Sequence, residues 1–446
     1  IKIKAEGSLT NTGTIAGRTL VRIDAGSIDN LGGRITGGKV ALDAVNDLNN
    51  IGGTIDARDS LSIEVGRDID IRSTTTSHQV GLSSNTGIDR VAGLYVTDPG
   101  GTLVASAGHD VNLVGAVVSN PGLGGFTSIS AKNDIHLQTV RESATLAGRG
   151  IDNNSAMVAS SSRELGTTIA THGTTLLNAG RDIDARQATV DAGQGWLDVT
   201  AGRDILIETG RQQSAGSYAM QWTDKALLSR TANTLSGQYD NSTSVGSRFS
   251  GGLVSMGAGN DLAIEGSQVS GTQGVMLSAG NQLNIVEGRN TASASVDFDR
   301  KRSSPIQDPV FMQNKASGTG IGVGRDTAAA STITSSQGGI LLQGGAVKLV
   351  GTQVSAARDI AIEGGSVNIA GAVERSEVHG EQRQRGGDFG PLGLHDLGHG
   401  LGAKSADMLE AETTGLARTT LSGANVTLTA TGPDGQGGDL HIAGTT

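Results

Sequence analysis

Apolar and polar residues alternate over many short windows of this chain, and turn residues separate the windows. The segment 20–24 reads Leu-Val-Arg-Ile-Asp, and the segment 40–44 reads Val-Ala-Leu-Asp-Ala. Alternation of this kind predicts β-strands with one buried face. Gly and Asn between the windows supply turns, because both residues tolerate positive φ. No helical periodicity accompanies the pattern, so we expect an all-β fold.

The first 65 residues repeat with a period of 20 residues. A triplet of Gly, Thr or Arg, and Ile begins at residues 13, 33 and 53. Each triplet follows a turn that contains an asparagine, at Asn11, Asn30 and Asn50. Two or three short strands per 20 residues describe one coil of a β-helix.

A second phrase recurs later in the chain, and it consists of a small residue, Gly, a polar residue, Asp and a strand. Ala-Gly-Arg-Asp-Ile occurs at 179–183 and at 201–205. We therefore divide the chain into 1–65, with 20-residue coils, and 66–446, with longer repeats. About a dozen coils, stacked ~4.8 Å apart, predict a rod of roughly 60 Å.

Five strands of the second part are each followed by a segment outside the solenoid pattern. These strands contain Ile69, Ile135, Ile205, Leu283 and Val367. The inserts run approximately over 72–104, 138–174, 208–252, 286–336 and 370–419. Insertions in a solenoid map to one face, and that face often binds a partner.

The inserts carry strand patterns of their own. Thr291–Phe298 alternates throughout, and Tyr218–Trp222 alternates as well. We expect Val245–Phe249 and Ile321–Val323 to pair with these segments, so that the inserts form long β-hairpins extending sideways with mobile tips. A short helix is expected only around Ala406–Glu412.

Composition narrows the possible partners and the class of protein. The net charge is −10, which argues against bulk attraction to nucleic acid or anionic lipid. Aromatic residues make up 2% of the chain, so a narrow core of Ile, Val, Leu and Ala is expected. The chain has no cysteine, shows no apolar run long enough to span a membrane, and begins at Ile1 without a signal peptide. We interpret it as an interior stretch of a longer exported protein.

Together these motifs resemble the haemagglutinin repeats of filamentous haemagglutinin and its relatives. The motifs are Gly-Thr-Ile after Asn turns, Ala-Gly-Arg-Asp-Ile, and the phrases Gly-Ser-Gln-Val-Ser at 266–270 and Gly-Thr-Gln-Val-Ser at 351–355. Toxins of the CdiA type, which mediate contact-dependent growth inhibition, carry the same repeats. The resemblance covers essentially the whole chain.

The resemblance implies a right-handed parallel β-helix in a two-partner secretion exoprotein. It further implies export through a dedicated outer-membrane transporter and display at the surface of a Gram-negative cell. The sequence contains neither the secretion domain nor the toxin domain of this family, and it contains no Arg-Gly-Asp triplet.

The repeated aspartates are the first candidates for chemistry, because a row of carboxylates could serve a polysaccharide-active β-helix enzyme with calcium. They are Asp68, Asp110, Asp134, Asp182, Asp204, Asp261 and Asp359. An active site occurs once, whereas this residue returns in every repeat. We therefore interpret each Asp as a turn residue that binds nearby backbone N–H groups, and we expect no catalytic residue and no enzyme.

Metal sites are not expected either. His395 and His399 lie four residues apart, which on a helix could hold zinc. Neighbouring glycines disfavour a helix there, so we interpret both as loop residues. Gly437-Gly438-Asp439 lacks the nine-residue period of calcium-binding β-rolls. We expect neither a metal nor another cofactor.

Two groups in the inserts are candidates for ligand binding. The aromatic group suits stacking on sugars or a protein partner, or packing of the hairpin arms. The basic group, with Arg289 nearby, suits contact with sulfated glycan or phosphate. The candidate residues are Tyr218, Trp222, Tyr239, Phe249, Arg300, Lys301 and Arg302.

The sequence thus predicts the shaft of a secreted filamentous adhesin. Such a shaft attaches to a host-cell glycan or receptor and projects distal domains from the cell. The alternative is the stalk of a contact-dependent growth inhibition toxin that engages the envelope of a target bacterium. A β-helix enzyme acting on polysaccharide is the third possibility, but no single cluster of acids and bases supports it.

Overall fold

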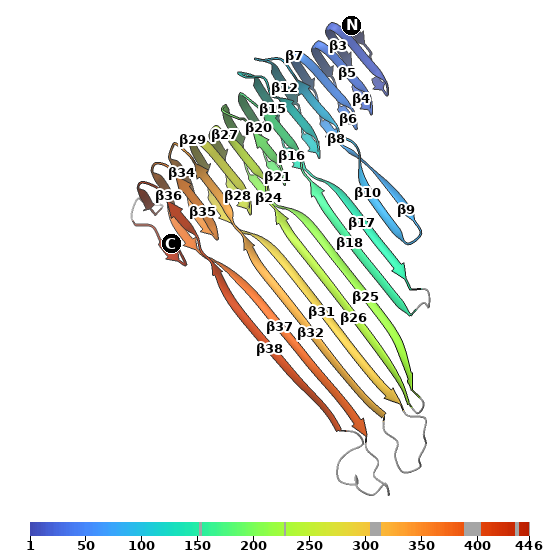
Figure 1. Ribbon diagram of the computed structural model, residues 1–446. Coiled ribbons are helices and arrows are strands. Elements are labelled where there is room, and N and C mark those ends of the chain that lie inside the picture. The colour runs from blue at the N-terminus through green and yellow to red at the C-terminus, as the bar shows by residue number, and fades with distance from the viewer. Residues whose placement is uncertain (151–153, 227–228, 304–313, 388–402, 433–436, 446) are drawn as a thin grey trace, which may run out of the picture.

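In the computed structural model, the chain forms a parallel β-helix from which a second, antiparallel sheet projects to one side (Figure 1). The structure describes residues 1–150, 154–226, 229–303, 314–387, 403–432 and 437–445. No helix occurs among these residues. The prediction of an all-β parallel solenoid with β-hairpin inserts is confirmed.

Equivalent strands of successive coils pair in parallel into three stacks, which form the three sides of the solenoid. Stack I consists of β1 (Lys2–Lys4), β3 (Thr14–Ala25), β5 (Arg34–Ala44), β7 (Thr54–Val65), β12 (Thr102–Ala107), β15 (Phe126–Ala131), β20 (Thr174–Ala179), β23 (Trp196–Ala201), β27 (Arg248–Ala258), β29 (Gln268–Ala279), β34 (Ile340–Val350), β36 (Ile360–Ala370) and β40 (Val426–Ala430).

Stack II follows stack I along each coil. It consists of β2 (Ser8–Asn11), β4 (Ser27–Leu31), β6 (Leu48–Ile51), β8 (Ile69–Arg72), β13 (Val111–Val114), β16 (Ile135–Gln138), β21 (Ile183–Arg186), β24 (Ile205–Glu208), β28 (Asp261–Glu265), β30 (Gln282–Val286), the second halves of β34 and β36, and β41 (Leu440–Ala443).

Stack III closes each coil. It consists of the first halves of β3, β5, β7, β27 and β29, together with β11 (Gly93–Val96), β14 (Val117–Asn120), β19 (Thr168–Thr171), β22 (Thr189–Asp191), β33 (Ser331–Ser335), β35 (Thr352–Ala356) and β39 (Thr420–Ser422). Stack I has thirteen strands, and twelve spacings of ~4.8 Å give a rod of about 58 Å.

The core is a set of columns of apolar side chains that run along the inside of the stacks. One column contains Val21, Val40, Leu61 and Leu103, which occupy paired positions in stack I. None of the four is more than 1% exposed. Burying each such side chain stabilises the fold by ~1.5–3 kcal/mol. The alternation seen in the sequence is therefore the alternation between this core and solvent.

Asparagines of the first coils form a buried ladder instead of adopting positive φ. Asn11 donates from Nδ2 to Oδ1 of Asn30 (2.8 Å), and Asn30 donates in the same way to Asn50 (2.7 Å). The positive φ values fall on neighbouring glycines, Gly32 and Gly52. The expectation that Asn supplies the left-handed turn was wrong, because its side chain is needed to satisfy the interior.

The glycine of the second phrase is required by close approach between coils. A Cβ on Gly202 would lie 2.2 Å from the carbonyl oxygen of Gly180, one coil earlier. A Cβ on Gly259 would lie 2.1 Å from the carbonyl oxygen of Gly202. No side chain fits at these two positions, whereas the looser copies of the phrase carry Lys132 and Ala357 in place of the glycine.

The five inserts are β-hairpins, and all leave the solenoid between stack II and stack III (Figure 1). They are β9 (Thr74–Val80) with β10 (Ser83–Arg90), β17 (Val140–Arg149) with β18 (Ser155–Leu165), β25 (Gly210–Ala226) with β26 (Ser229–Val245), β31 (Gly288–Ser303) with β32 (Asn314–Ala329), and β37 (Ala372–Gly387) with β38 (Ala403–Ala417). The helix expected around Ala406–Glu412 is wrong, because this segment pairs with β37 as part of β38.

The hairpins also pair with one another, and they form one continuous ten-stranded antiparallel sheet, here called the lateral sheet. Hairpins follow β8, β16, β24, β30 and β36, whereas β13, β21, β28 and β34 continue directly into stack III. From β8 onward, every second coil therefore carries a hairpin, whereas the coils of β2, β4 and β6 carry none. Two coils of the solenoid and two strands of the lateral sheet have the same width of about 9.6 Å. The two sheets therefore keep the same spacing along the axis of the solenoid.

A buried hydroxyl closes the base of each of the last four hairpins. A Ser or Thr just after the hairpin donates from its side-chain hydroxyl. The acceptor is the backbone carbonyl of the last residue in the stack II strand that precedes the hairpin. Ser247 Oγ, for example, donates to the carbonyl of Glu208 (2.9 Å). The four residues are Thr167, Ser247, Ser331 and Thr419. At the first hairpin, Ser73 Oγ instead accepts from the N–H of Ala92 (3.0 Å).

None of the described residues belongs to a helix that is long and apolar enough to cross a membrane.

Candidate binding surface on the lateral sheet

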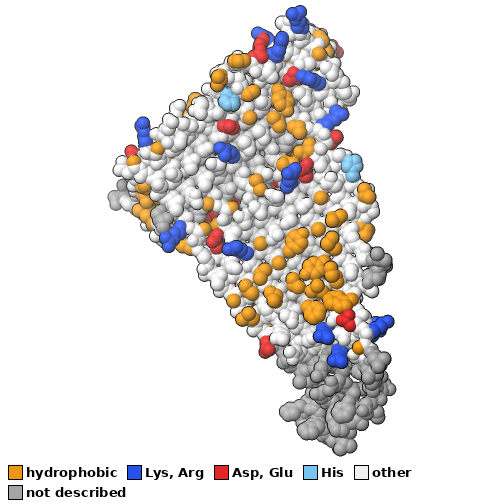
Figure 2. Space-filling view, in the orientation of Figure 1, with side chains coloured by type: hydrophobic (Ala, Val, Ile, Leu, Met, Phe, Trp, Pro, Cys, Tyr) orange, Lys and Arg blue, Asp and Glu red, His pale blue; other side chains and the backbone are white. Residues whose placement is uncertain are grey.

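The lateral sheet has one apolar face. Residues directly opposite one another in paired strands lie on the same face, and two rows of such residues cross eight strands from β17 to β38. The first row is Leu146, Ala159, Gly216, Tyr239, Ala294, Val323, Val378 and Ala411. The second row is Gly148, Met157, Tyr218, Gly237, Val296, Ile321, Gly380 and Leu409. Figure 2 shows hydrophobic side chains gathered over the lateral sheet.

The opposite face of the sheet is polar. Its β32 positions include Gly318 and Gly320, and neighbouring carboxylates lie over both. A Cβ on Gly318 would lie 2.4 Å from Oδ1 of Asp299, and one on Gly320 would lie 2.5 Å from Oδ1 of Asp297. Arg383 contacts Asp297 at 3.7 Å. Small residues and ion pairs thus occupy this face, which we call the polar face.

The tyrosines among the candidates cover glycines within their own hairpin. Tyr239 lies directly opposite Gly216, and Tyr218 lies opposite Gly237. A Cβ on Gly216 would lie 2.5 Å from the Tyr239 ring, and one on Gly237 would lie 2.6 Å from the Tyr218 ring. Aromatic rings that cover glycines help to fix the register of paired strands. Tyr239 nevertheless remains 40% exposed.

Phe249 does not belong with the other aromatic candidates. It lies in β27, on the stack III side of the solenoid, and its exposed fraction is 0%. The insert ends at Val245, four residues before Phe249. A side chain in the solenoid core cannot stack on a ligand, so its place among the candidates was wrong.

Strand alternation divides the basic run between the two faces. Arg300 and Arg302 share the apolar face with Phe298, because all three lie an even number of residues apart in β31. Lys301 points to the polar face. Arg289 lies eleven residues from Arg300 along the same strand, which is ~36 Å. Arg289 contacts Glu287 and Asp326 at the base of the hairpin, so it takes no part in the basic group.

Two candidate groups therefore meet near the outer end of the apolar face. The rings of Trp222 and Phe298 lie 6.2 Å apart between centroids and are tilted by 34°. Arg300 lies opposite Asn233, which lies opposite Trp222. We call Trp222, Phe298, Arg300 and Arg302 the distal cluster. Trp222 is 42% exposed, and Arg300 and Arg302 are exposed.

One polar pair, Asn233 and Asp224, lies beside the distal cluster. Asn233 is buried to 4% exposure, and its Nδ2 donates to Oδ2 of Asp224 (2.8 Å). Asp224 lies opposite Thr231, which lies opposite Arg302. The cluster thus combines an aromatic surface and two guanidinium groups with the Asp224 carboxylate nearby.

The repeated aspartates form a ladder between coils and do not gather at a site. Oδ1 of each Asp accepts a hydrogen bond of 3.1–3.2 Å from the backbone N–H of the Asp one coil further along. The ladder runs through Asp68, Asp110, Asp134, Asp182, Asp204 and Asp261. Asp359 accepts instead from Asn425 Nδ2 (2.8 Å). Each Asp therefore bonds to its neighbouring coil, whereas we had expected it to close its own turn.

The polar residue before each Asp reinforces the ladder. Arg203 forms an ion pair with Asp182, and Asn260 donates to Asp204 (2.8 Å). Arg181 pairs in the same way with Asp134. Burial opposes ionisation of Asp134, but hydrogen bonds from Arg181 and from the Asp182 backbone hold its pKa below the usual range.

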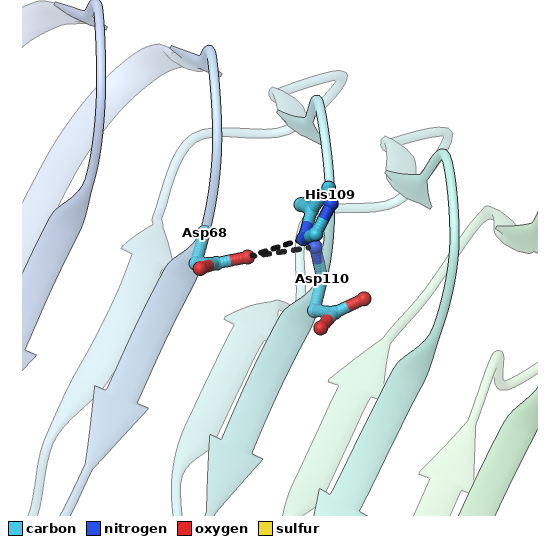
Figure 3. A group of neighbouring side chains, drawn as sticks. All are labelled: Asp68, His109 and Asp110. Atoms are coloured by element: carbon cyan, nitrogen blue, oxygen red, sulfur yellow. Dashed lines mark hydrogen bonds and ion pairs between the residues drawn. The ribbon is translucent and has the colours of Figure 1, made fainter.

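One rung of the ladder brings possible metal ligands together. Among the described residues, only Asp68, His109 and Asp110 offer three ligand atoms within 4.8 Å of one another (Figure 3). His109 Nδ1 lies 3.6 Å from Oδ1 of Asp68, and the Asp110 N–H donates to that same oxygen (3.1 Å). His109 takes the position that Arg203 holds elsewhere, so we assign the group to the ladder. His395 and His399 lie outside the described residues.

Comparison with known proteins agrees with the architecture. Residues 150–299 match the model of the hemagglutinin repeat family. A 16S rRNA endonuclease CdiA of Enterobacter cloacae is 29% identical over 82% of this chain and 13% of its own length. A tRNA nuclease CdiA of Escherichia coli is 25% identical over 86% of this chain and 13% of its own length. A tRNA nuclease CdiA-2 of Burkholderia pseudomallei is 22% identical over 86% and 15%. No solved structure matches.

The fold and these matches define the class of protein, which is a repeat solenoid with a lateral sheet of hairpins. Residues 150–299 carry a match to the hemagglutinin repeat, and most of the chain is similar to part of the CdiA proteins, so the chain resembles a haemagglutinin-repeat segment of the filamentous haemagglutinin and CdiA type. It spans 13–15% of the length of these relatives. The nuclease activities in their names are those of the whole relatives.

Proposed function

We propose that this chain is a rigid part of the shaft of a secreted filamentous protein, which projects distal domains from the cell and contributes to attachment. The observation that carries the proposal is the shared spacing of the two sheets. From β8 onward, a hairpin on every second coil joins the lateral sheet to the solenoid, so bending one requires bending the other. The columns of buried side chains, together with the Asn ladder of the first coils and the Asp ladder of the later coils, add resistance to bending along the rod.

Attachment is assigned to the distal cluster. Guanidinium groups bind sulfate and phosphate oxygens in a planar, bidentate manner. Exposed aromatic rings stack on the apolar faces of sugars, and Trp222 offers such a ring beside Arg300. The ligand class that fits is an anionic glycan on a cell surface. Lys301 belongs to the other face and is not part of this site.

The resemblance to this family supports the partners and the location that we propose. The shaft passes through an outer-membrane transporter of a two-partner system and is displayed outside a Gram-negative cell. Absence of cysteine from the sequence is compatible with such export. We assign no catalytic step to this segment, because its repeated carboxylates are engaged between coils.

A second function is favoured by the relatives, all three of which are named CdiA. In that case the shaft engages the envelope of a target bacterium, and a toxin elsewhere in the longer protein is delivered. The same distal cluster would then bind the anionic glycan of the bacterial surface.

The test is binding of the labelled 446-residue chain to epithelial cells, red cells and Gram-negative bacteria. Replacing Arg300 and Arg302 with Ala should weaken binding at least tenfold. The matched control is Lys301→Ala, which removes the same kind of charge from the same strand on the opposite face and should bind like the wild type. Host-cell binding supports adhesion, whereas selective binding to bacteria supports toxin delivery. Equal binding by both variants would overturn the assignment of the site.

A further inference from the structure

We propose that the apolar face of the lateral sheet packs against the same face of a second copy of this chain, so that two shafts pair side by side. The proposal concerns the two apolar rows. These rows lie nearer the solenoid than the distal cluster, which continues the same face towards the hairpin tips.

An uncovered apolar face is unusual for a single antiparallel sheet. Such sheets normally bury one face against a core and leave the other in water. Here Met157, Val296 and Ile321 are 49%, 44% and 56% exposed, and Leu409 is 65% exposed. A contiguous exposed apolar surface of this kind marks an interaction site.

The composition of the rows favours a second copy over another occupant. Neither row contains a charged side chain. A face that meets its own copy must avoid like charges, because each charge would oppose an identical one. The rows also mix large and small residues, since Tyr239 lies between Gly216 and Ala294. Two such faces can interdigitate at the ~10 Å separation of packed sheets.

The size of the face suits a stable dimer. The two rows cross eight strands, which span ~38 Å at the usual spacing. A third row adds Met220, Leu235 and Phe298 beyond them. Two rows extend ~14 Å along all eight strands, and the third row is apolar on three strands only, so the face measures about 600 Å². Stable interfaces bury roughly 600–1,000 Å² on each partner.

The shape of the molecule leaves room for this arrangement. The lateral sheet extends well clear of the solenoid (Figure 1). A two-fold axis parallel to the solenoid would bring the apolar faces together and place the two solenoids on opposite sides. Both shafts would then run in the same direction, as two filaments anchored on one cell must.

The test is the mass of the 446-residue chain by sedimentation and light scattering at micromolar concentration. The wild type should give twice the 45.0 kDa chain mass. Met157→Lys with Val378→Lys should give the monomer mass. The matched control is Val158→Lys with His379→Lys, which adds the same charges to the same strands on the polar face and should remain a dimer.

Circular dichroism of all three proteins checks that each remains folded. A wild type that is monomeric at tens of micromolar overturns the proposal. A dimer of the variant Met157→Lys with Val378→Lys, as stable as that of the control, overturns it as well. Wild-type monomers that bind lipid vesicles through these same residues would also overturn it, because the face would then serve a membrane surface.

Discussion

The backbone N–H of Asp204 donates a 3.2 Å hydrogen bond to Oδ1 of Asp182, one coil earlier. This bond, repeated from coil to coil, explains the recurring phrase of the sequence. Gly fits where the backbones of neighbouring coils approach closely. The next residue binds the carboxylate of the Asp in the preceding coil, and the Asp accepts a hydrogen bond from the backbone of the following coil. The phrase therefore encodes contact between coils.

The ladder predicts how Asp204 responds to substitution. Asp204 accepts from the Asp261 N–H and from Asn260. Asp204→Asn keeps an acceptor oxygen, so its cost should be below about 1 kcal/mol, whereas Asp204→Ala should cost about 1–3 kcal/mol because it leaves the Asp261 N–H without its acceptor. Hydrogen exchange of the amides in β24 and β28 measures both. Equal effects of the two variants would refute the ladder.

The core columns predict that substitution to Asp destabilises the fold very differently at two adjacent residues of β24. Ile205 is 1% exposed, whereas Leu206 is 36% exposed and points outward. Ile205→Asp should unfold the local coils, because a buried unpaired carboxylate costs several kcal/mol. Leu206→Asp should change stability by less than about 1 kcal/mol. Limited proteolysis around these residues distinguishes the two, and similar cleavage rates would contradict the assignment of the core face.

The Asn ladder predicts that Asn30 is essential to the first coils. Asn30 is 0% exposed, accepts from Asn11 and donates to Asn50. Asn30→Ala should destabilise residues 1–65 by about 1–3 kcal/mol, because it leaves buried polar groups unpaired. Amide exchange should quicken in β4 and remain unchanged in β30. Uniform exchange along the whole rod would argue against a local role.

His136 predicts a dependence of stability on pH. Its Nδ1 lies 3.1 Å from Oδ2 of Asp184, and this hydrogen bond raises the pKa of His136, with help from the charges of Asp134 and Asp110 and against the effect of burial. A raised folded-state pKa stabilises the fold fully below the unfolded pKa of ~6.5, and that contribution is lost as pH rises through the folded value. The stability gap between wild type and His136→Gln should therefore be larger at about pH 6 than at about pH 9. Urea unfolding measures the gap, and a constant gap would contradict the pairing.

The sequence predicted the solenoid and the hairpins because both depend on local alternation. The expected pairing of Ile321–Val323 is confirmed, since Val296 lies opposite Ile321. The expected pairing of Val245–Phe249 with Tyr218–Trp222 is wrong, because Tyr218 lies opposite Gly237. Strands that are polar on one face and solvent-exposed on both specify register weakly, so their alternation could not reveal the partner.

The joining of hairpins into one sheet could not be predicted from local pattern. It depends on the equal spacing of coils and strands, which places Asp240 of β26 opposite Ser293 of β31. The distal cluster was missed for the same reason, because its members come from different hairpins. The re-entry hydroxyls, such as Ser247, carry a usable signal, since Ser or Thr stands just before, or at the first position of, the strand that follows each of the last four hairpins.

The most direct test of the account is a disulfide between hairpins. The chain has no cysteine, and residues paired across a sheet have Cα atoms about 4.5–5.5 Å apart, which a disulfide can bridge. The account predicts that Asp240→Cys with Ser293→Cys forms an intramolecular disulfide under mild oxidation. The matched control, Asp240→Cys with Ala294→Cys, points its thiols to opposite faces and should not form one. Failure of the paired variant to cross-link, or equal cross-linking of both, would show that the hairpins are independent arms and that no continuous lateral sheet exists.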